Sequence, residues 1–391
     1  MKKIKLYLLI IIPSIILSIY LFEGYLIGKK NSREFNEKKK EIILKRQGFK
    51  YDKRNKMQVY KDELLKNKNT SVTITPKTFN DTNKKIHFLS GKSNSYTIGC
   101  NENGYYSSYL SDRYGFNNPN QMWDEDKIEY LIVGDSFAHG ECVSDANDIG
   151  SIIRNSYKKT VLNLGYKGNG PLSMLASLKE YAPNNFKNLL WLYFEGNDLD
   201  DLREELEINI LKKYYTDNNF FQNLKNKQNY IDKQVDRVIL DSIKLEDQIY
   251  SENKKNSKLK YKILKFIRLD NSKEMFFKRT NKNKLKKNSL INLKKILILV
   301  KKFTEEKNVN LYFVYLPQYE RYTKKIFWND NNYNEIKKIL HDLNIKTIDI
   351  NSELFEKEKE PTSLFPFGMW GHYNEEGYKK IAEKIYKLSL N

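Results

Sequence analysis

The sequence predicts an α/β fold in which helices cover both faces of a mainly parallel sheet. Five short apolar runs rich in β-branched and aromatic residues recur between residues 128 and 350, segments of helical periodicity separate them, and an apolar N-terminal segment stands apart from both. Strands that alternate with helices form parallel sheets whose two faces are buried. We therefore expect one five-stranded α/β domain preceded by a membrane helix.

The expected elements alternate regularly, with one interruption. The expected strands are residues 128–133, 161–164, 189–194, 311–315 and 346–350. The expected helices lie near residues 149–157, 172–181, 290–306, 333–343 and 374–388. Between the third and fourth strands, residues of about 202–289 are rich in Lys and Asn and helical in character. We expect them to form a helical insertion, a cap or arm, rather than an independent domain.

Composition and charge exclude several classes of protein. Apolar residues make up 40% of the 391-residue chain, which is enough for a sizeable core and excludes wholesale disorder. Two Cys and four His exclude a Cys/His zinc module and a disulfide-dense scaffold. The net charge of +20 is concentrated in residues 29–68 and 254–287, and no nucleic-acid-binding motif accompanies it. We expect no nucleic acid partner, and the basic windows are either solvated faces or surfaces for anionic lipid or an acidic glycan.

The N-terminus predicts a membrane anchor. Residues 6–22 carry no charge, follow Lys2, Lys3 and Lys5, and would span roughly 25 Å as a helix. No small-residue cleavage site follows, which favours an uncleaved single-pass anchor over the alternative, a cleaved secretory signal. The positively charged residues before the anchor favour a cytoplasmic N-terminus, so we expect the rest of the protein to be extracytoplasmic. We expect an anchor over residues 1–28, a basic linker over 29–85 and the α/β domain over 86–391.

Chemistry is expected in the turns that follow the strands, because ligands of parallel α/β sheets bind outside the carboxyl ends of the strands. The first strand is followed by Gly134-Asp135-Ser136-Phe137 and the second by a glycine-rich turn containing Gly168. Asn197 follows the third strand, and His372 precedes the last helix. A Ser hydroxyl beside the N–H groups of a helix start, an Asn amide and a His base are the parts of a nucleophilic site.

These four blocks resemble, in order, those of the SGNH/GDSL hydrolase superfamily, over roughly residues 95–391. The resemblance implies a three-layer α/β/α fold with a five-stranded, flavodoxin-like sheet, and ester hydrolysis or acyl transfer without a cofactor. It implies that Ser136 is the nucleophile and His372 the base. It also implies an oxyanion hole formed by the amides of Ser136 and Gly168 and the side chain of Asn197.

One position departs from the superfamily pattern. Its members usually place an Asp three residues before the catalytic His, and Met369 occupies that position here. Loss of the corresponding carboxylate in the serine-protease triad lowers the rate by about 10⁴. Asp349, at the end of the fifth expected strand, is the first candidate for a replacement, with a helix cap as its alternative role. Asp198 and Glu195 are second choices.

For several other residues, the sequence leaves more than one role open. Ser136 can serve as a helix cap and Asn197 as a turn residue. His139, three residues after Ser136, is expected to be structural or substrate-facing rather than the base. Cys100 and Cys142 form either one disulfide or two free thiols. No spacing of His, Cys, Asp and Glu fits a metal site.

Within the insertion, one segment predicts a basic amphipathic helix. Its apolar residues Leu259, Ile263, Phe266 and Ile267 lie among Lys258, Lys260, Lys262, Lys265 and Arg268. It either binds anionic lipid or an acidic polymer, or packs on the main domain as a cap.

Together with the resemblance, these features predict a membrane-anchored serine esterase that removes an acyl group from a cell-envelope or exported glycan. The glycan part of this expectation rests on the expected topology and on analogy with the superfamily, not on any residue. The alternatives are an O-acyltransferase with the same Ser-His site, and a catalytically silent glycan-binding protein.

Overall fold

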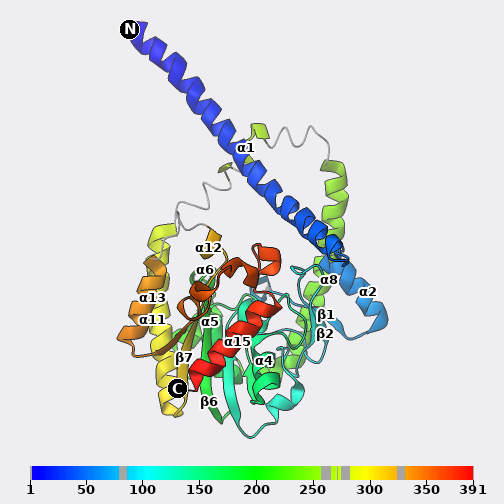
Figure 1. The fold of residues 1–391 in the computed structure, drawn as a ribbon, viewed down its shortest axis with the longest axis vertical. Helices are drawn as coiled ribbons and strands as arrows, with labels where there is room; N and C mark the ends of the chain where they lie inside the picture. Colours follow the sequence, from blue (N-terminus) through cyan, green and yellow to red (C-terminus); the bar gives the residue numbers. More distant parts are fainter. Residues whose placement is uncertain are drawn as a thin grey trace. The chain divides into compact units, whose positions relative to one another are not determined.

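The computed structural model describes residues 2–78, 86–256, 266–270, 272–273, 282–323 and 331–390. Figure 1 shows the fold. The strands are β1 (Thr70–Val72), β2 (Tyr96–Ile98), β3 (Ser108–Leu110), β4 (Ile128–Val133), β5 (Val161–Asn163), β6 (Phe186–Phe194), β7 (Asn310–Leu316) and β8 (Lys346–Asp349). The α-helices are α1 (Lys2–Arg46), α2 (Lys56–Lys66), α3 (Ser136–His139), α4 (Ile149–Tyr157), α5 (Pro171–Tyr181), α6 (Asp198–Glu205), α7 (Asn209–Thr216), α8 (Gln228–Asn256), α11 (Lys282–Glu306), α12 (Glu320–Thr323), α13 (Asn331–Asp342), α14 (Ile350–Glu353) and α15 (Glu375–Ser389). Short 3-10 turns are η1 (Pro76–Thr78), η2 (Asn120–Trp123), η3 (Leu224–Lys227), η5 (Phe355–Lys357), η6 (Pro361–Leu364) and η7 (Pro366–Gly368).

The chain divides into two units. The first comprises Met1–Tyr51 and Ser242–Leu285, and the second comprises Asp52–Asp241 and Lys286–Asn391. The helical insertion lies between β6 and β7, as expected, and its residues are shared between the two units.

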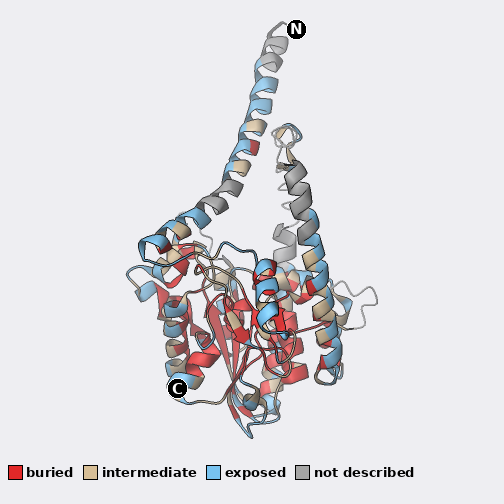
Figure 2. Cartoon of the chain, turned by 90° about the vertical axis from the view of Figure 1, so that its right-hand side faces the viewer, coloured by how far each residue is buried: buried red, intermediate tan, exposed pale blue. Residues whose placement is uncertain are grey.

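The first unit contains α1, whose stretch Ile10–Gly28 is long and apolar enough to cross a membrane. That stretch has 19 residues, a mean hydropathy of 2.0 and only 6% of its residues buried. Figure 2 shows this helix largely in the colour of exposed residues. Apolar side chains such as Ile16 and Leu21 are therefore left uncovered by protein. Most of the expected basic amphipathic segment, including Leu259 and Ile263, lies outside the described residues.

The second unit is built on a five-stranded sheet in the order β5-β4-β6-β7-β8, and every neighbouring pair is parallel. The five strands and the helices α4, α5, α11, α13 and α15 coincide with the predicted elements to within a few residues, apart from an N-terminal extension of α11. The order reverses at β4, because β5 lies on one side of it and β6 on the other. Such a reversal leaves a crevice at the carboxyl end of the central strand, which is where ligands bind in open α/β sheets.

Both faces of this sheet are buried, which explains the continuous apolar runs. Ile132, Leu190 and Val314 belong to a core that includes Ile153 of α4 and Ile381 of α15. The alternate strand residues, for example Leu131, Trp191 and Phe313, are also fully buried and face the opposite layer, as the two-residue period of a strand requires. The three-layer α/β/α architecture is confirmed, and Figure 2 shows the sheet as a band of buried residues.

Residues 29–85, expected as a basic linker, are divided between the two units. Residues 29–46 continue helix α1, whereas α2 and β1 belong to the second unit. There β1 pairs in parallel with β2, and β2 pairs antiparallel with β3, to form a small separate sheet. Each of these strands has three residues, which is too short for hydrophobic periodicity to reveal.

Candidate active site

The turn after β4 presents the Ser136 hydroxyl at the point where the strand order reverses. Asp135 caps the short helix α3 by accepting a hydrogen bond of 2.8 Å from the Phe137 N–H. Gly134 is required here because a Cβ at this position would lie 2.5 Å from the Cβ of Ala138. Ser136 is the first residue of α3 and is 8% exposed. The local sequence therefore sets the hydroxyl at the carboxyl edge of the sheet.

The expected partner of this hydroxyl is in contact with it. His372 lies in the loop before α15, and its Nε2 is 2.8 Å from Ser136 Oγ. The two residues are 236 positions apart in the chain. The ring of Phe137 packs on the imidazole, with ring centroids 4.5 Å apart. Ser136 and His372 are thus held at the distance that proton transfer between them requires.

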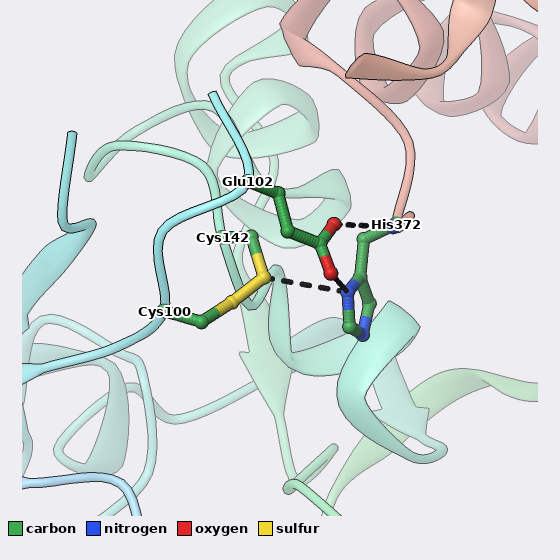
Figure 3. A group of neighbouring side chains, drawn as sticks. All are labelled: Cys100, Glu102, Cys142 and His372. Carbon is green, nitrogen blue, oxygen red and sulfur yellow. Dashed lines mark hydrogen bonds and ion pairs between the residues drawn. A yellow bond between two sulfur atoms is a disulfide. The ribbon is translucent and has the colours of Figure 1, made fainter. Parts of the chain in front are cut away.

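A carboxylate from a third segment orients the imidazole. Glu102 Oε1 lies 3.1 Å from His372 Nδ1, and Glu102 Oε2 accepts a hydrogen bond of 2.6 Å from the His372 backbone N–H (Figure 3). Gly371 permits this approach, because a Cβ there would lie 2.5 Å from Glu102 Oε2. With Nδ1 protonated and bonded to Glu102, Nε2 carries the free lone pair that faces Ser136.

Glu102 lies in the loop between β2 and β3, and a disulfide holds that loop to the segment that follows Ser136. Cys100, two residues before Glu102, is bonded to Cys142, six residues after Ser136. The side-chain amide of Asn103 adds a hydrogen bond of 2.9 Å to the Cys142 carbonyl. Figure 3 shows the disulfide beside Glu102 and His372. The cysteines were expected to form either one disulfide or two free thiols, and the structure contains the disulfide.

Burial and charge act in opposite directions on the pKa of His372. Burial lowers it, and the negative charge and hydrogen bond of Glu102 more than compensate, so that the pKa lies above its ordinary value. The buried carboxylate of Glu141 contributes to the increase. Glu141 is ionised, since the charges of Lys167 and Lys56 outweigh burial and lower its pKa to about 2. The protonated form of His372 is therefore stabilised.

Asp349, the first candidate for the orienting acid, has a different role. Its side chain caps α14 by accepting from the N–H groups of Asn351 and Ser352. It also accepts a hydrogen bond from the Tyr333 hydroxyl and lies 3.5 Å from the Lys337 ammonium. The expectation is corrected: the carboxylate beside His372 belongs to Glu102, and Asp349 is the helix cap that was its alternative.

The second choices are also engaged elsewhere. Glu195 forms a buried ion pair with Arg321, at 2.6 Å, and accepts from the Tyr315 hydroxyl at 2.6 Å. Asp198 accepts a hydrogen bond of 3.1 Å from the Phe194 N–H and is fully buried.

The residues expected in the oxyanion hole lie in the turns after β5 and β6. Gly168 has a φ of +76°, and a Cβ there would lie 2.4 Å from Thr75 Cγ2, so glycine is required on two grounds. Asn197 donates a hydrogen bond of 2.9 Å to Asp201 and lies close enough to Asp135 to affect its pKa. Among the described residues, no acceptor is bonded to the backbone N–H of Ser136 or Gly168. Their assignment to an oxyanion hole stays a proposal.

His139 is a packing residue. It is 1% exposed, its Nδ1 lies 3.2 Å from the Gly165 carbonyl oxygen, and its ring meets those of Tyr109 and Tyr166 edge-on. Burial lowers its pKa, which keeps the ring neutral.

Sequence reasoning missed Glu102 because no local pattern marks it. It lies in an irregular loop, 270 residues before His372. The available signals were indirect: a Cys two residues away, and a Gly immediately before His372.

Comparison with known proteins gives likenesses to solved structures only. No family model matches the sequence, and no curated protein is significantly similar to it. One solved structure that the chain resembles is that of a candidate lipolytic protein of the G-D-S-L family from Desulfitobacterium hafniense DCB-2. The identity is 12%, the match covers 68% of this chain and 99% of that chain, and the TM-score is 0.30. At this identity and TM-score, the likeness supports no conclusion about the reaction. Any conclusion about the reaction rests on the geometry of the site.

Proposed function

We propose that this protein is a serine esterase in which Ser136, His372 and Glu102 form the catalytic triad. The observation that carries the proposal is the continuous chain of contacts from Ser136 Oγ to His372 Nε2, at 2.8 Å, and from His372 Nδ1 to Glu102, at 3.1 Å. This is the arrangement by which a neutral imidazole activates a serine hydroxyl.

The reaction follows from the positions of the three groups. Ser136 Oγ bonds to the ester carbonyl carbon as its proton passes to His372 Nε2, and Glu102 stabilises the imidazolium. The tetrahedral intermediate then expels the alcohol, which takes the proton from Nε2 and leaves an acyl-Ser136. Water, activated by the same Nε2, releases the carboxylic acid and regenerates the hydroxyl. No group other than these residues, the ester and water is needed to balance the steps.

The negative charge on the carbonyl oxygen needs donors, and we assign them to the Ser136 and Gly168 N–H groups and the Asn197 amide. The support for this assignment is that each lies in a turn at the carboxyl end of a strand of the same sheet. Donors placed where charge develops lower the barrier by about 3 to 4 kcal/mol each in serine hydrolases.

An O-acyl group on a cell-envelope or exported glycan is the substrate class that we favour. The apolar stretch Ile10–Gly28 supports attachment to a membrane. Disulfides persist in oxidising compartments, so the Cys100–Cys142 bond supports an extracytoplasmic site. Trp370, two residues before His372, is 61% exposed and offers a flat apolar face to a sugar ring. The silent-protein alternative loses its main argument, because Glu102 supplies the acid that Met369 does not.

The test is turnover of a short-chain aryl ester by the full chain in detergent micelles. We expect steady release of the phenol, its loss in Ser136→Ala, and full retention in Ser156→Ala, an exposed serine in α4. The same assay with an added oligosaccharide separates the two enzyme alternatives, since an acyltransferase would release phenol only with that acceptor and acylate it. No turnover under either condition would contradict the proposal.

A further inference from the structure

Four groups that bind metals well converge beside the proposed triad. The sulfur atoms of Cys100 and Cys142, a Glu102 carboxylate oxygen and a His372 ring nitrogen all lie within 4.8 Å of one another. They come from the β2–β3 loop, the segment after α3 and the loop before α15. The spacing of these residues in the sequence therefore does not indicate a metal site. Figure 3 shows the four side chains pointing at one another.

The distances among these donors are close to those of a tetrahedral zinc site. With Zn–S, Zn–N and Zn–O bonds of about 2.3, 2.05 and 2.0 Å, neighbouring ligands lie about 3.6 Å apart for S and N and about 3.3 Å apart for N and O. Here Cys142 Sγ lies 3.3 Å from His372 Nδ1, and Glu102 Oε1 lies 3.1 Å from it. The remaining donor pairs also lie within 4.8 Å, and the two sulfur atoms are too close together because they are bonded to each other.

Reduction of the disulfide removes that obstacle. An external dithiol supplies two electrons and two protons, its own sulfurs join, and Cys100 and Cys142 become thiols. Binding of Zn²⁺ then releases both thiol protons and leaves two thiolate ligands. Cys142 is fully buried and Cys100 is partly exposed, so the reductant reaches the bond from the Cys100 side.

We propose that the reduced protein binds Zn²⁺ through Cys100, Cys142, His372 and Glu102, and that the bound ion stops ester hydrolysis. The inhibitory half of this proposal rests on the proposed function. A metal on Nδ1 forces the imidazole proton onto Nε2, and Nε2 then has no lone pair to accept the Ser136 proton. The disulfide thus has two roles: it ties Glu102 to the nucleophile segment, and it withholds the thiolates from thiophilic metals.

Metal binding is measured first, without reference to activity. The chain has only two Cys, so reduction is complete when two thiols titrate. After reduction with a phosphine and its removal, we expect equilibrium dialysis to give one Zn²⁺ per reduced chain and none per oxidised chain. With Co²⁺ as probe, we expect the strong visible bands of a tetrahedral site and a sulfur-to-cobalt band in the near ultraviolet. Equal binding by both redox states, or no binding by the reduced chain, would overturn the inference.

One variant, with a matched control, tests the cysteine ligand. The loss of an outer-shell partner costs about 10- to 100-fold in metal affinity. We therefore expect Cys142→Ser, which removes a direct ligand, to bind Zn²⁺ at least about 100-fold more weakly than the reduced wild type. His341→Asn, at an exposed histidine in α13, is the matched control and should bind normally. Reoxidation of the wild type with oxidised glutathione should abolish binding, which tests the site without any substitution. Normal binding by Cys142→Ser would also contradict the assignment.

Activity is measured second, on the reduced chain with and without Zn²⁺. We expect Zn²⁺ to lower aryl ester turnover more than 10-fold and EDTA to restore it, while the oxidised chain is unaffected. Unchanged turnover in a reduced chain that holds one Zn²⁺ would refute the inhibitory half. The two proposals fail separately: binding without turnover in any state refutes the proposed function alone, and turnover without binding refutes the metal site alone.

Discussion

Glu102 uses its two carboxylate oxygens on two different donors of His372. One oxygen faces the ring Nδ1 and the other accepts the backbone N–H of the same residue, so the carboxylate fixes both the tautomer and the position of the histidine. A hydrogen bond to a charged group contributes about 1.5–3 kcal/mol, more than a neutral one. In the superfamily that the sequence resembles, the acid usually lies three residues before the histidine, whereas here Glu102 comes from a loop 270 residues away in the chain.

Replacement of Glu102 by Gln tests this role through the pH profile. The charge of Glu102 raises the pKa of His372 against the opposing effect of burial. Because the general base must be neutral, kcat/KM of the wild type should rise with pH, with a midpoint above the ordinary histidine value of about 6.5. In Glu102→Gln burial dominates, so the midpoint should move to lower pH while the plateau falls by about 10² to 10⁴.

Esterase assays between pH 5 and pH 9 check the shift. Glu360→Gln, at an exposed glutamate before η6, should leave both midpoint and plateau unchanged. A Glu102→Gln profile with the wild-type midpoint and plateau would mean that the carboxylate does not act on His372.

At the scale of elements, the turns after β4 and β6 bring two buried carboxyl groups together. Asp135 and Asp198 each have a raised pKa, first because of burial, and the charge of Asp135 contributes to the effect on Asp198. In the described structure, Asp135 Oδ2 and Asp198 Oδ1 are buried without a hydrogen-bond partner. These two turns carry the proposed nucleophile and the Asn197 amide, so the site is built at a cost in stability.

Asp198→Asn should relieve that cost. A carboxyl group whose folded pKa is raised binds its proton more tightly in the folded state, so stability is highest below the unfolded pKa and falls as the pH rises through the folded pKa. The side-chain amide of the variant does not titrate, so it causes no loss of stability as the pH rises. Its NH₂ group can donate a hydrogen bond to Asp135. We expect Asp198→Asn to be about 1–3 kcal/mol more stable than wild type at pH 8 and nearly equal to it at pH 4.5.

Unfolding of the full chain in micelles, followed by circular dichroism in urea, measures the difference. Asp200→Asn, at an exposed position of the same helix, should change stability by less than about 0.5 kcal/mol. If Asp198→Asn is less stable than wild type at both pH values, the carboxyl pair is not strained.

Part of the fold and part of the candidate site could be predicted from the sequence, and the rest could not. The five strands of the central sheet were predictable because burial on both faces leaves continuous apolar runs, as in Leu189 to Leu192. The place of Ser136 was predictable because ligand-binding turns follow the ends of parallel strands, whereas its contact with His372 was expected from the resemblance of the four sequence blocks. The small sheet of β1, β2 and β3 was not, since three-residue strands depend on long-range pairing. Glu102 lies in the loop between β2 and β3, so its position could not be predicted either.

For the molecule as a whole, the proposed membrane attachment depends on α1. Its stretch Ile10–Gly28 is long and apolar enough to cross a membrane, and a bilayer would cover the apolar side chains that the protein leaves exposed. The part of the chain that holds the proposed triad belongs to the other unit. Reaction and attachment are therefore assigned to separate parts of the chain.

Removal of residues 2–28 tests the attachment. The full chain should sediment with membranes and resist extraction by alkaline carbonate, whereas the truncated chain should appear in the soluble fraction. The transfer of an apolar segment of this length into a bilayer is favourable enough to withstand loss of all surface charge interactions. Release of the full chain by carbonate would show that α1 is not a membrane span.

We propose that Ser136 is a nucleophile activated by His372, and a fluorophosphonate probe reports on this because it reacts covalently with an activated serine hydroxyl. We expect one probe per chain, located on Ser136 by peptide mass spectrometry, with labelling abolished in Ser136→Ala and reduced more than 100-fold in His372→Ala. Labelling that persists in Ser136→Ala, or that proceeds at the wild-type rate in His372→Ala, would contradict it.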